Sequence, residues 1–394
     1  MQPPSFQGGR PRFDIADIVR AHGEALARET PLTLAQRRVV SAIASCRTAA
    51  LGGHLDLCCS CGHVHPSYNS CRNRHCPKCQ ALAQERWIVA RQARFLPVRH
   101  FHVVFTLPSE LRRLGQWAPK LIFTTLFRAA SETLLELGRS RLHANIGVTA
   151  VLHTWTRDLR FHPHVHCIVT AGGLAEAGDR WVSSDKQYLF PVEVMGTLLR
   201  GKVMQMLHTL RASRAFDGFD DFRPPDGFDR LMRQLARSKW VVYAKKPFCR
   251  ADHVLRYLGR YTHRVGLSNS RLVDVTENTV TFRTKDGQTV TLSPIEFLGR
   301  FLQHVLPPSF VKIRHFGLLA GAHVDGKLEQ ARQLLAPQDT PSSTNASPST
   351  DELSWESLLR ALNGKDVWRC PVCGAHVVRQ ILPPLSRAPP RSIG

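Results

Sequence analysis

The stretch Phe161-His162-Pro163-His164-Val165-His166-Cys167-Ile168-Val169-Thr170 decides how this chain is interpreted. Its apolar residues are typical of a β-strand that packs on a hydrophobic layer. Successive side chains of a strand point to opposite faces, so His164 and His166 share one face while Val165 faces a core. Two imidazoles at this spacing can hold one metal ion. The alternative is a pair of surface or hydrogen-bonded histidines.

The segment before this strand supplies a candidate third ligand. Residues 148–155 are expected to form a strand, followed by a turn that returns the chain antiparallel. In that register His153 lies opposite His164. A slip of one residue would point His153 away, and Asp158 and His162 are then the alternatives. Three protein ligands leave positions open for water or a phosphate oxygen, as a catalytic ion requires.

Two Cys-x-x-Cys knuckles further upstream predict a structural zinc site. Each knuckle can place two thiolates on a tetrahedral zinc ion, and two knuckles complete a closed site. The ligands expected from this spacing are Cys58, Cys61, Cys76 and Cys79. Cys71 and His75 are alternatives that could replace a ligand or build a second site. Arg72 and Arg74 beside the second knuckle suit phosphate contact, or else a solvated loop.

Residues 251–264 form a second stretch of chemical interest, rich in tyrosine and arginine. Tyr257 and Tyr261 are four residues apart, so on a helix they share one face. Such pairs commonly serve core packing, but the chain has only 5 tyrosines and these two lie among arginines. We therefore expect a polar, phosphate-facing helix. The residues expected to bind DNA phosphates are Arg72, Arg74, Lys245, Arg256, Arg260 and Arg264.

Composition limits the class of protein. A chain of 394 residues with 43% hydrophobic and 21% charged residues is expected to be globular, with two or three domains. Its 53 Lys and Arg against 31 Asp and Glu give a net charge of +22, which attracts polyanions, nucleic acid first. With no long apolar span and no signal-peptide core, we expect a cytoplasmic, nucleoid-associated prokaryotic protein without a membrane partner. The 11 cysteines are then metal ligands or buried thiols rather than disulfides.

Together these residues predict metal-assisted phosphoryl transfer. An ion bound by His164, His166 and His153 polarises a scissile phosphate, and a tyrosine hydroxyl attacks the phosphorus in line. The products are a covalent 5′-phosphotyrosine and a free 3′-OH, and a second tyrosine lets one hold a DNA end while the other cleaves. The expected catalytic ion is Mg²⁺ or Mn²⁺, with imidazole ligands favouring Mn²⁺ in affinity, and the expected structural ion is Zn²⁺.

The sequence resembles the rolling-circle insertion-sequence transposases of the HUH endonuclease superfamily, in the two-tyrosine class with an N-terminal zinc-binding domain. The matching stretches run in the expected order over residues 40–320 and are residues 71–80, 105–108, 153–155, 162–166 and 257–264. The resemblance implies an antiparallel sheet with flanking helices, His164 and His166 as ligands, and Tyr257 and Tyr261 as nucleophiles. It also implies partners of single-stranded DNA at the ends of a mobile element and target DNA, and it leaves a homo-oligomer open.

Other classes of function share some of these features. A plasmid-type replication initiator or relaxase would use the same chemistry, but the zinc module and the lack of a helicase-like phosphate loop favour the transposase. A non-catalytic zinc-dependent DNA-binding regulator would form no covalent DNA adduct. A zinc nucleobase deaminase is excluded, because it needs His-x-Glu ahead of its Pro-Cys-x-x-Cys, and here the position is His166 with the knuckles upstream.

The predicted fold class is α+β, with a helical and zinc-binding module followed by an HUH-type antiparallel nuclease domain. The domains are residues 1–97, the catalytic residues 98–320, a Pro-, Ser- and Thr-rich linker in 321–352, and a tail 353–394. The tail carries Cys370 and Cys373, half a zinc site whose partners the sequence does not identify.

The secondary structure expected within these domains can be read from the hydrophobic pattern. It comprises helices over 13–50, 81–97, 111–142, 193–210 and from Ser293 to about Val305; strands over 100–108, 240–243 and 311–317; and a meander over 272–292. The sequence Lys245-Lys246-Pro247 is expected to end its strand. His102 could face the metal site, but a core-edge histidine is the preferred interpretation.

Overall fold

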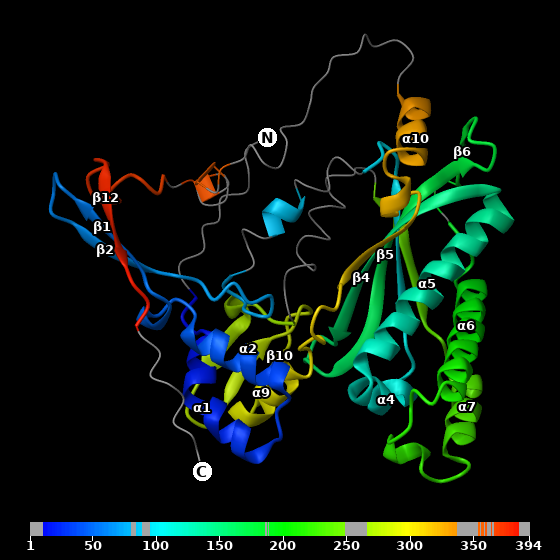
Figure 1. Ribbon diagram of the computed structural model, residues 1–394, viewed down its shortest axis with the longest axis horizontal. Coiled ribbons are helices and arrows are strands. Elements are labelled where there is room, and N and C mark those ends of the chain that lie inside the picture. Colours follow the sequence, from blue (N-terminus) through cyan, green and yellow to red (C-terminus); the bar gives the residue numbers. More distant parts are fainter. Residues whose placement is uncertain are drawn as a thin grey trace.

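Figure 1 shows the protein as a computed structural model. The structure describes residues 11–79, 84–88, 95–185, 187, 189–248, 266–336, 354, 356–357, 359–360, 364 and 366–385. The candidate nucleophiles Tyr257 and Tyr261 lie outside the described residues, as do Arg256, Arg260 and Arg264. The described parts combine helices with three antiparallel sheets, which confirms the α+β class.

The largest sheet is antiparallel and has β5 (Phe161–Ala175) at its centre. In spatial order its strands are β11 (Ile313–Gly317), β4 (Ala144–Trp155), β5, β3 (His100–Thr106) and β7 (Val242–Phe248), and β6 (Trp181–Ser183) pairs with β5. Since β5 is paired on both sides, its backbone polar groups are used by the ladder. The predicted histidine strand is therefore an interior strand of the sheet, as are its neighbours β4 and β3.

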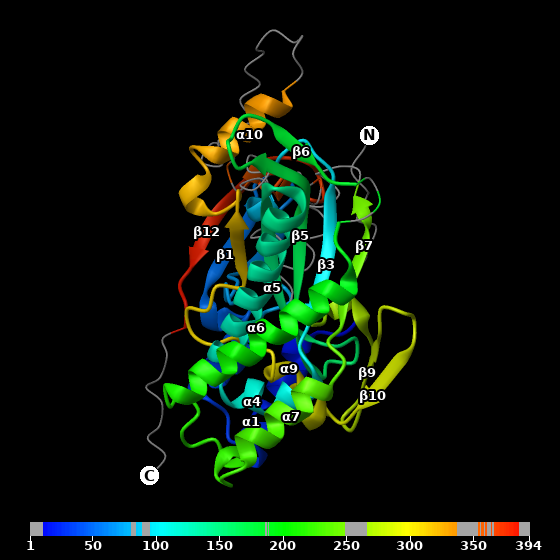
Figure 2. The ribbon, with the colours of Figure 1, turned by 90° about the vertical axis from the view of Figure 1, so that its right-hand side faces the viewer.

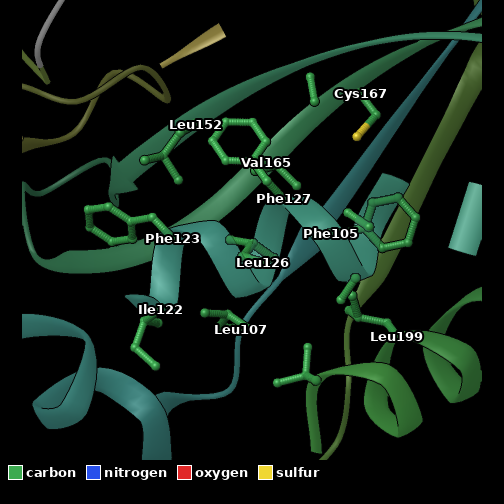
Figure 3. Packing of buried hydrophobic residues seen from close by; sticks show 14 of the residues in the cluster. Phe105, Leu107, Ile122, Phe123, Leu126, Phe127, Leu152, Val165, Cys167 and Leu199 are labelled. Atoms are coloured by element: carbon green, nitrogen blue, oxygen red, sulfur yellow. The ribbon is translucent and has the colours of Figure 1, made fainter. Parts of the chain in front are cut away.

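One face of this sheet is a hydrophobic layer covered by helices, as Figure 2 shows. These helices are α4 (Arg112–Trp117), α5 (Pro119–Leu142), α6 (Val192–Ala212) and α7 (Gly227–Arg237). Val165 of β5 and Phe105 of β3 pack with Phe123 and Phe127 of α5 (Figure 3). Burying each such side chain contributes about 1.5–3 kcal/mol. Because strand residues alternate, this core leaves the even-numbered histidines of β5 on the opposite face.

A second core joins the N-terminal helices to the predicted meander. Its elements are α1 (Ile15–Glu29), α2 (Leu34–Ser45), β8 (Leu272–Val275), β9 (Val280–Arg283), β10 (Thr289–Leu292) and α9 (Pro294–Leu302). Ile18 and Val39 of the helices belong to the same buried cluster as Phe282 and Phe297. A short meander has too small an apolar face to stand alone. This core therefore crosses the domain boundary predicted near residue 97.

The start of α9 has the predicted local chemistry. The hydroxyl of Ser293 accepts the backbone N–H of Glu296 at 3.2 Å, and Pro294 occupies the first turn. The helix ends at Leu302, one turn before the predicted Val305. The short remaining elements are η1 (Ala49–Leu51), η2 (Ser109–Leu111), η3 (Asp220–Phe222), η4 (Asn269–Arg271), η5 (Gly321–His323) and α10 (Lys327–Leu335).

The third sheet joins a hairpin from the N-terminal part of the chain to a strand from the C-terminal part. It consists of β1 (Gly53–Cys58) between β2 (Val64–Tyr68) and β12 (Val377–Leu382), seen at the left of Figure 1. The sequence predicted no strand after residue 317, and it assigned residues 353–394 to a separate tail. Instead, β12 pairs antiparallel with β1 along its whole length.

The strand β7 differs from its prediction. It continues through Lys245-Lys246-Pro247 to Phe248, with an irregular register opposite His100 and His102. Proline lacks a backbone N–H, but an edge strand needs its ladder bonds on one side only.

Residues 84–88 are helical, within the predicted helix 81–97. Among the helices of the described residues, none is long and apolar enough to cross a membrane.

Candidate active site

Three histidines converge on the sheet face opposite the helices. His153 of β4 is the register partner of His164 of β5, as predicted, and His166 lies two residues further along. Their ring centroids are 4.2 Å apart for His153 and His166, 5.0 Å for His164 and His166, and 5.3 Å for His153 and His164. One ring nitrogen from each lies within 4.8 Å of the other two. This donor set fits one divalent ion with three imidazole ligands and further positions open.

The imidazoles of this cluster are neutral over the physiological pH range. Burial lowers the pKa of His164 to about 4. Burial, and then the neighbouring histidines, hold the pKa values of His153 and His166 well below their usual range. A metal ion requires neutral imidazole, so protons do not compete for these nitrogens near pH 7.

Two of the candidate ligands, His164 and His166, have one ring nitrogen in a hydrogen bond, which orients the other ring nitrogen. His164 Nδ1 lies 2.8 Å from the carbonyl oxygen of His162, and it donates there. His166 Nδ1 lies 2.8 Å from His102 Nε2, with the two rings nearly parallel. In both ligands Nε2 is the nitrogen left for a metal. That tautomer has His166 donating its Nδ1–H to His102, which fixes the ring direction.

His102 therefore lies on the face of the three clustered histidines, as the alternative interpretation of the sequence had it, and the preferred core-edge position was wrong. The residue pairs with Ile168 of β5, so its side chain shares the face of His166. The alternation His100-x-His102 on a strand paired with β5 is the sequence signal that agrees with this position.

We expect the variant His102→Ala to weaken binding of Mn²⁺ about ten- to a hundredfold, because partners of this kind orient metal ligands. The variant His102→Gln should recover much of the loss, since its amide oxygen can accept the same N–H. The measurement is Mn²⁺ titration of the full chain by calorimetry. His100→Ala removes another buried histidine of the same strand and should leave the affinity near that of the parent. Equal affinity in His102→Ala would contradict this role.

The two alternative ligands are placed elsewhere. The carboxylate of Asp158 bonds Thr156 and lies 2.9 Å from the guanidinium of Arg160 within the β4–β5 turn. The ring of His162 is 5.6 Å from that of His164, and it is not one of the three clustered rings. His153 is thus the third ligand that the geometry favours.

The ring of His153 is fixed by an aromatic neighbour. It stacks on Trp155 at a centroid distance of 4.8 Å with 14° between the planes. Lys312 Nζ lies 5.1 Å from the centroid of the Trp155 ring, and burial lowers the pKa of this lysine to about 7. When protonated, Lys312 adds a positive charge close to the cluster, and that charge is one of the causes that lower the pKa of His153.

Lysines from two other elements also lie close to the cluster. Lys245 of β7 is the register partner of His102, and Lys285 lies in the turn between β9 and β10. The positive charges of both contribute to the lowered pKa of His166. Arg157 anchors the Lys285 turn to the β4–β5 turn through a 2.9 Å ion pair with Asp286. Lys245 was among the residues predicted to bind DNA phosphates, whereas Lys285 was not. The only sequence signal for Lys285 is its place in a polar Lys-Asp-Gly turn.

The cysteines form two clusters in place of the single predicted site. Cys76 and Cys79 meet Cys46 and Cys71, with Sγ–Sγ distances of 3.3 Å for Cys46 and Cys79 and 3.6 Å for Cys71 and Cys79. Cys58 and Cys61 meet Cys370 and Cys373 instead. The predicted set of Cys58, Cys61, Cys76 and Cys79 was therefore wrong.

The β1–β2 hairpin explains this separation. Cys58 ends β1 at the hairpin tip, whereas Cys71 follows soon after Asn69, which bonds Gly52 at the hairpin base. At about 3.3 Å per residue, the strand from Gly53 to Cys58 puts about 17 Å between tip and base. One zinc ion cannot join two knuckles at that separation.

Two residues of the second knuckle contact the segment that precedes β11: His75, which is buried, and Arg74, which is exposed. His75 Nε2 accepts the backbone N–H of Leu306 at 3.2 Å, so it is not in the thiol cluster. Arg74 donates to the carbonyl oxygens of Phe310 and Pro307 at 2.8 and 3.4 Å, and desolvation lowers its pKa. Arg74 therefore holds the segment before β11. Its guanidinium has fewer N–H groups left to contact DNA phosphates. Arg72 is exposed, and its contact with DNA stays a prediction.

An antiparallel sheet with imidazoles clustered on its neighbouring strands β4 and β5, preceded by a cysteine-rich module, is consistent with an HUH-type fold. Residues 18–107 match the family model described as "Transposase zinc-binding domain", and residues 147–326 match the one described as "Putative transposase". The chain belongs to the family of rolling-circle insertion-sequence transposases that carry an N-terminal zinc-binding domain.

Two relatives are similar along most of their length. The chain is 42% identical over 378 residues to "Putative transposase y4qJ" of Sinorhizobium fredii, covering 91% of this chain and 92% of that protein. It is 31% identical over 369 residues to "Transposase for insertion sequence element IS801" of Pseudomonas savastanoi pv. phaseolicola, covering 86% and 82%. No solved structure matches this chain.

Proposed function

We propose that this transposase nicks and joins single-stranded DNA at the ends of its insertion sequence through a covalent 5′-phosphotyrosine. The cluster of His153, His164 and His166 carries the proposal, because three neutral imidazoles with open positions suit a catalytic ion. When bound, the ion would polarise the scissile phosphate and neutralise the negative charge that develops in the transition state. Mn²⁺ or Mg²⁺ would serve, with imidazole favouring Mn²⁺.

The nucleophile is assigned to Tyr257 and Tyr261, by their four-residue spacing and by resemblance. One hydroxyl oxygen forms a bond to phosphorus while the bond from phosphorus to the 3′ oxygen breaks. The tyrosine proton ends on the leaving oxygen, which becomes a free 3′-OH. The phosphotyrosine conserves the bond energy, so attack by another 3′-OH can rejoin the strand.

The basic residues around the cluster are assigned to the DNA backbone. Lys245 and Lys285 lie on different elements near His166, and both are exposed. Exposed cations beside a phosphate-cleaving site attract the strand and hold its phosphates. A duplex would have to melt locally before one of its strands could enter this site. The arrangement therefore favours a single-stranded substrate.

The test is incubation of the protein with Mn²⁺ and single-stranded oligonucleotides from the element's verified ends, resolved on a denaturing protein gel. The parent should give a metal-dependent band of raised mass. The double variant of Tyr257→Phe and Tyr261→Phe should give none, and each single variant should keep part of the yield. Tyr243→Phe changes an exposed tyrosine of β7 and should match the parent.

An adduct that persists in the double variant would contradict the assigned nucleophiles. A parent that binds the end sequences without any adduct would favour a DNA-binding protein in which the histidines are structural.

A further inference from the structure

We infer that Cys58, Cys61, Cys370 and Cys373 bind a zinc ion of their own, which fastens the C-terminal tail to the N-terminal zinc module. This site is separate from the cluster at Cys46, Cys71, Cys76 and Cys79, and it does not depend on the proposed nuclease chemistry. Its two halves come from opposite ends of the chain.

The sulfur positions suit a tetrahedral ion. Cys58 Sγ is 3.4 Å from Cys373 Sγ, and Cys61 Sγ is 3.7 Å from Cys370 Sγ. All four sulfurs lie within 4.8 Å of one another. Zinc bound to four thiolates at about 2.3 Å places the sulfurs about 3.8 Å apart, close to these values.

The two knuckles have the same backbone design. Each is Cys-x-x-Cys-Gly, and the glycine N–H donates to the carbonyl oxygen of the first cysteine at 2.9 Å, from Gly62 to Cys58 and from Gly374 to Cys370. Gly62 and Gly374 have φ values of 70° and 76°, which favour glycine. Such matched turns point two pairs of thiols at a common centre.

Strand pairing brings the second knuckle to the first. Cys58 pairs with Val377 at one end of the β1–β12 ladder, and Gly53 pairs with Leu382 at the other. Within the ladder the guanidinium of Arg379 binds the carboxylate of Asp56 at 2.7 and 3.2 Å. Figure 1 shows β12 lying alongside β1.

Apolar burial at this sheet is too small to hold it together. The buried cluster among its described residues contains only Cys58, Cys370 and Val377, with Ala375 partly buried beside it. On β12, Val378 and Ile381 are 54% and 80% exposed. A sheet with so little core needs another source of stability, and small modules of this kind obtain it from a structural metal.

The first measurement is the zinc content of the full chain by mass spectrometry. The double variant of Cys370→Ser and Cys373→Ser should carry one zinc ion fewer than the parent. Cys59→Ser changes the exposed thiol next to Cys58 that is outside the cluster, and it should carry as much zinc as the parent. An unchanged zinc content in the double variant would overturn the inference.

The second measurement tests whether zinc holds the C-terminal tail on the rest of the protein. A protease site placed within residues 337–350 of the full chain allows the tail to be cut after folding. The cut tail should stay with the rest of the protein on size exclusion, and it should separate after zinc chelation or in the double variant. A cut tail that remains bound after complete zinc removal would show that strand pairing suffices, and would also overturn the inference. The chelation experiment uses the parent sequence at both cysteines, so its result does not depend on how the double variant folds.

Discussion

The variant His166→Ala is expected to nick single-stranded end DNA at least about a hundredfold more slowly than the parent at saturating Mn²⁺. A ring nitrogen of His166 lies within 4.8 Å of ring nitrogens of His153 and His164, so the three could share one ion. The ring of His166 is also hydrogen-bonded to His102. A catalytic ion supplies several kcal/mol of transition-state stabilisation, and each 1.36 kcal/mol changes the rate about tenfold. The measurement is the initial nicking rate as a function of Mn²⁺ concentration.

The matched control is His208→Ala, which removes an exposed histidine from α6 and should nick at the parent rate. Two further variants decide the third ligand. His153→Ala should lose activity as His166→Ala does, and His162→Ala should retain most of it. A full loss in His162→Ala with normal activity in His153→Ala would reverse the assignment.

The variant Phe127→Ala is expected to lower the free energy of unfolding by about 3–5 kcal/mol, since it leaves a large cavity. Phe127 is fully buried between α5 and the sheet, near Val165 (Figure 3). Its ring also lies 6.3 Å from that of Phe310 and 4.5 Å from the Arg314 guanidinium carbon. Such a loss is a large part of the 5–15 kcal/mol typical of a folded domain.

Chemical denaturation followed by circular dichroism measures this change. Leu334→Ala truncates a side chain that is 42% exposed on α10, and it should cost less than about 1 kcal/mol. A similarly small cost in Phe127→Ala would mean that the helices contribute little to the stability of the sheet.

Local patterns predicted the nuclease sheet well. The hairpin register that brings His153 opposite His164 followed from a short turn and alternating strands, and the structure confirms it. The meander and the start of α9 were also correct, because turn residues and caps act over a few residues. For His102 the less favoured interpretation was the correct one. Its role depends on which strand lies beside β5, and pairing between distant strands leaves little trace in one sequence.

The cysteine sites show the same limit more clearly. Each Cys-x-x-Cys knuckle was recognisable by itself, but spacing does not tell which two knuckles meet. Cys370 and Cys373 lack nearby partners because those partners lie at the other end of the chain. The strand β12 has mostly exposed residues and a weak alternation, so its pairing with β1 could not be predicted locally.

The three candidate metal sites differ in the length of chain between the residues that form them. The imidazole ligands span only residues 153–166, within one hairpin, whereas Cys58 and Cys373 are 315 residues apart. The entropic cost of closing a loop grows with the logarithm of its length, so the tail site costs about 3 kcal/mol more to close than the hairpin site. Zinc binding of about 10–16 kcal/mol exceeds that cost. We therefore expect the hairpin to assemble by itself, while the tail site forms only after both ends of the chain have folded into place.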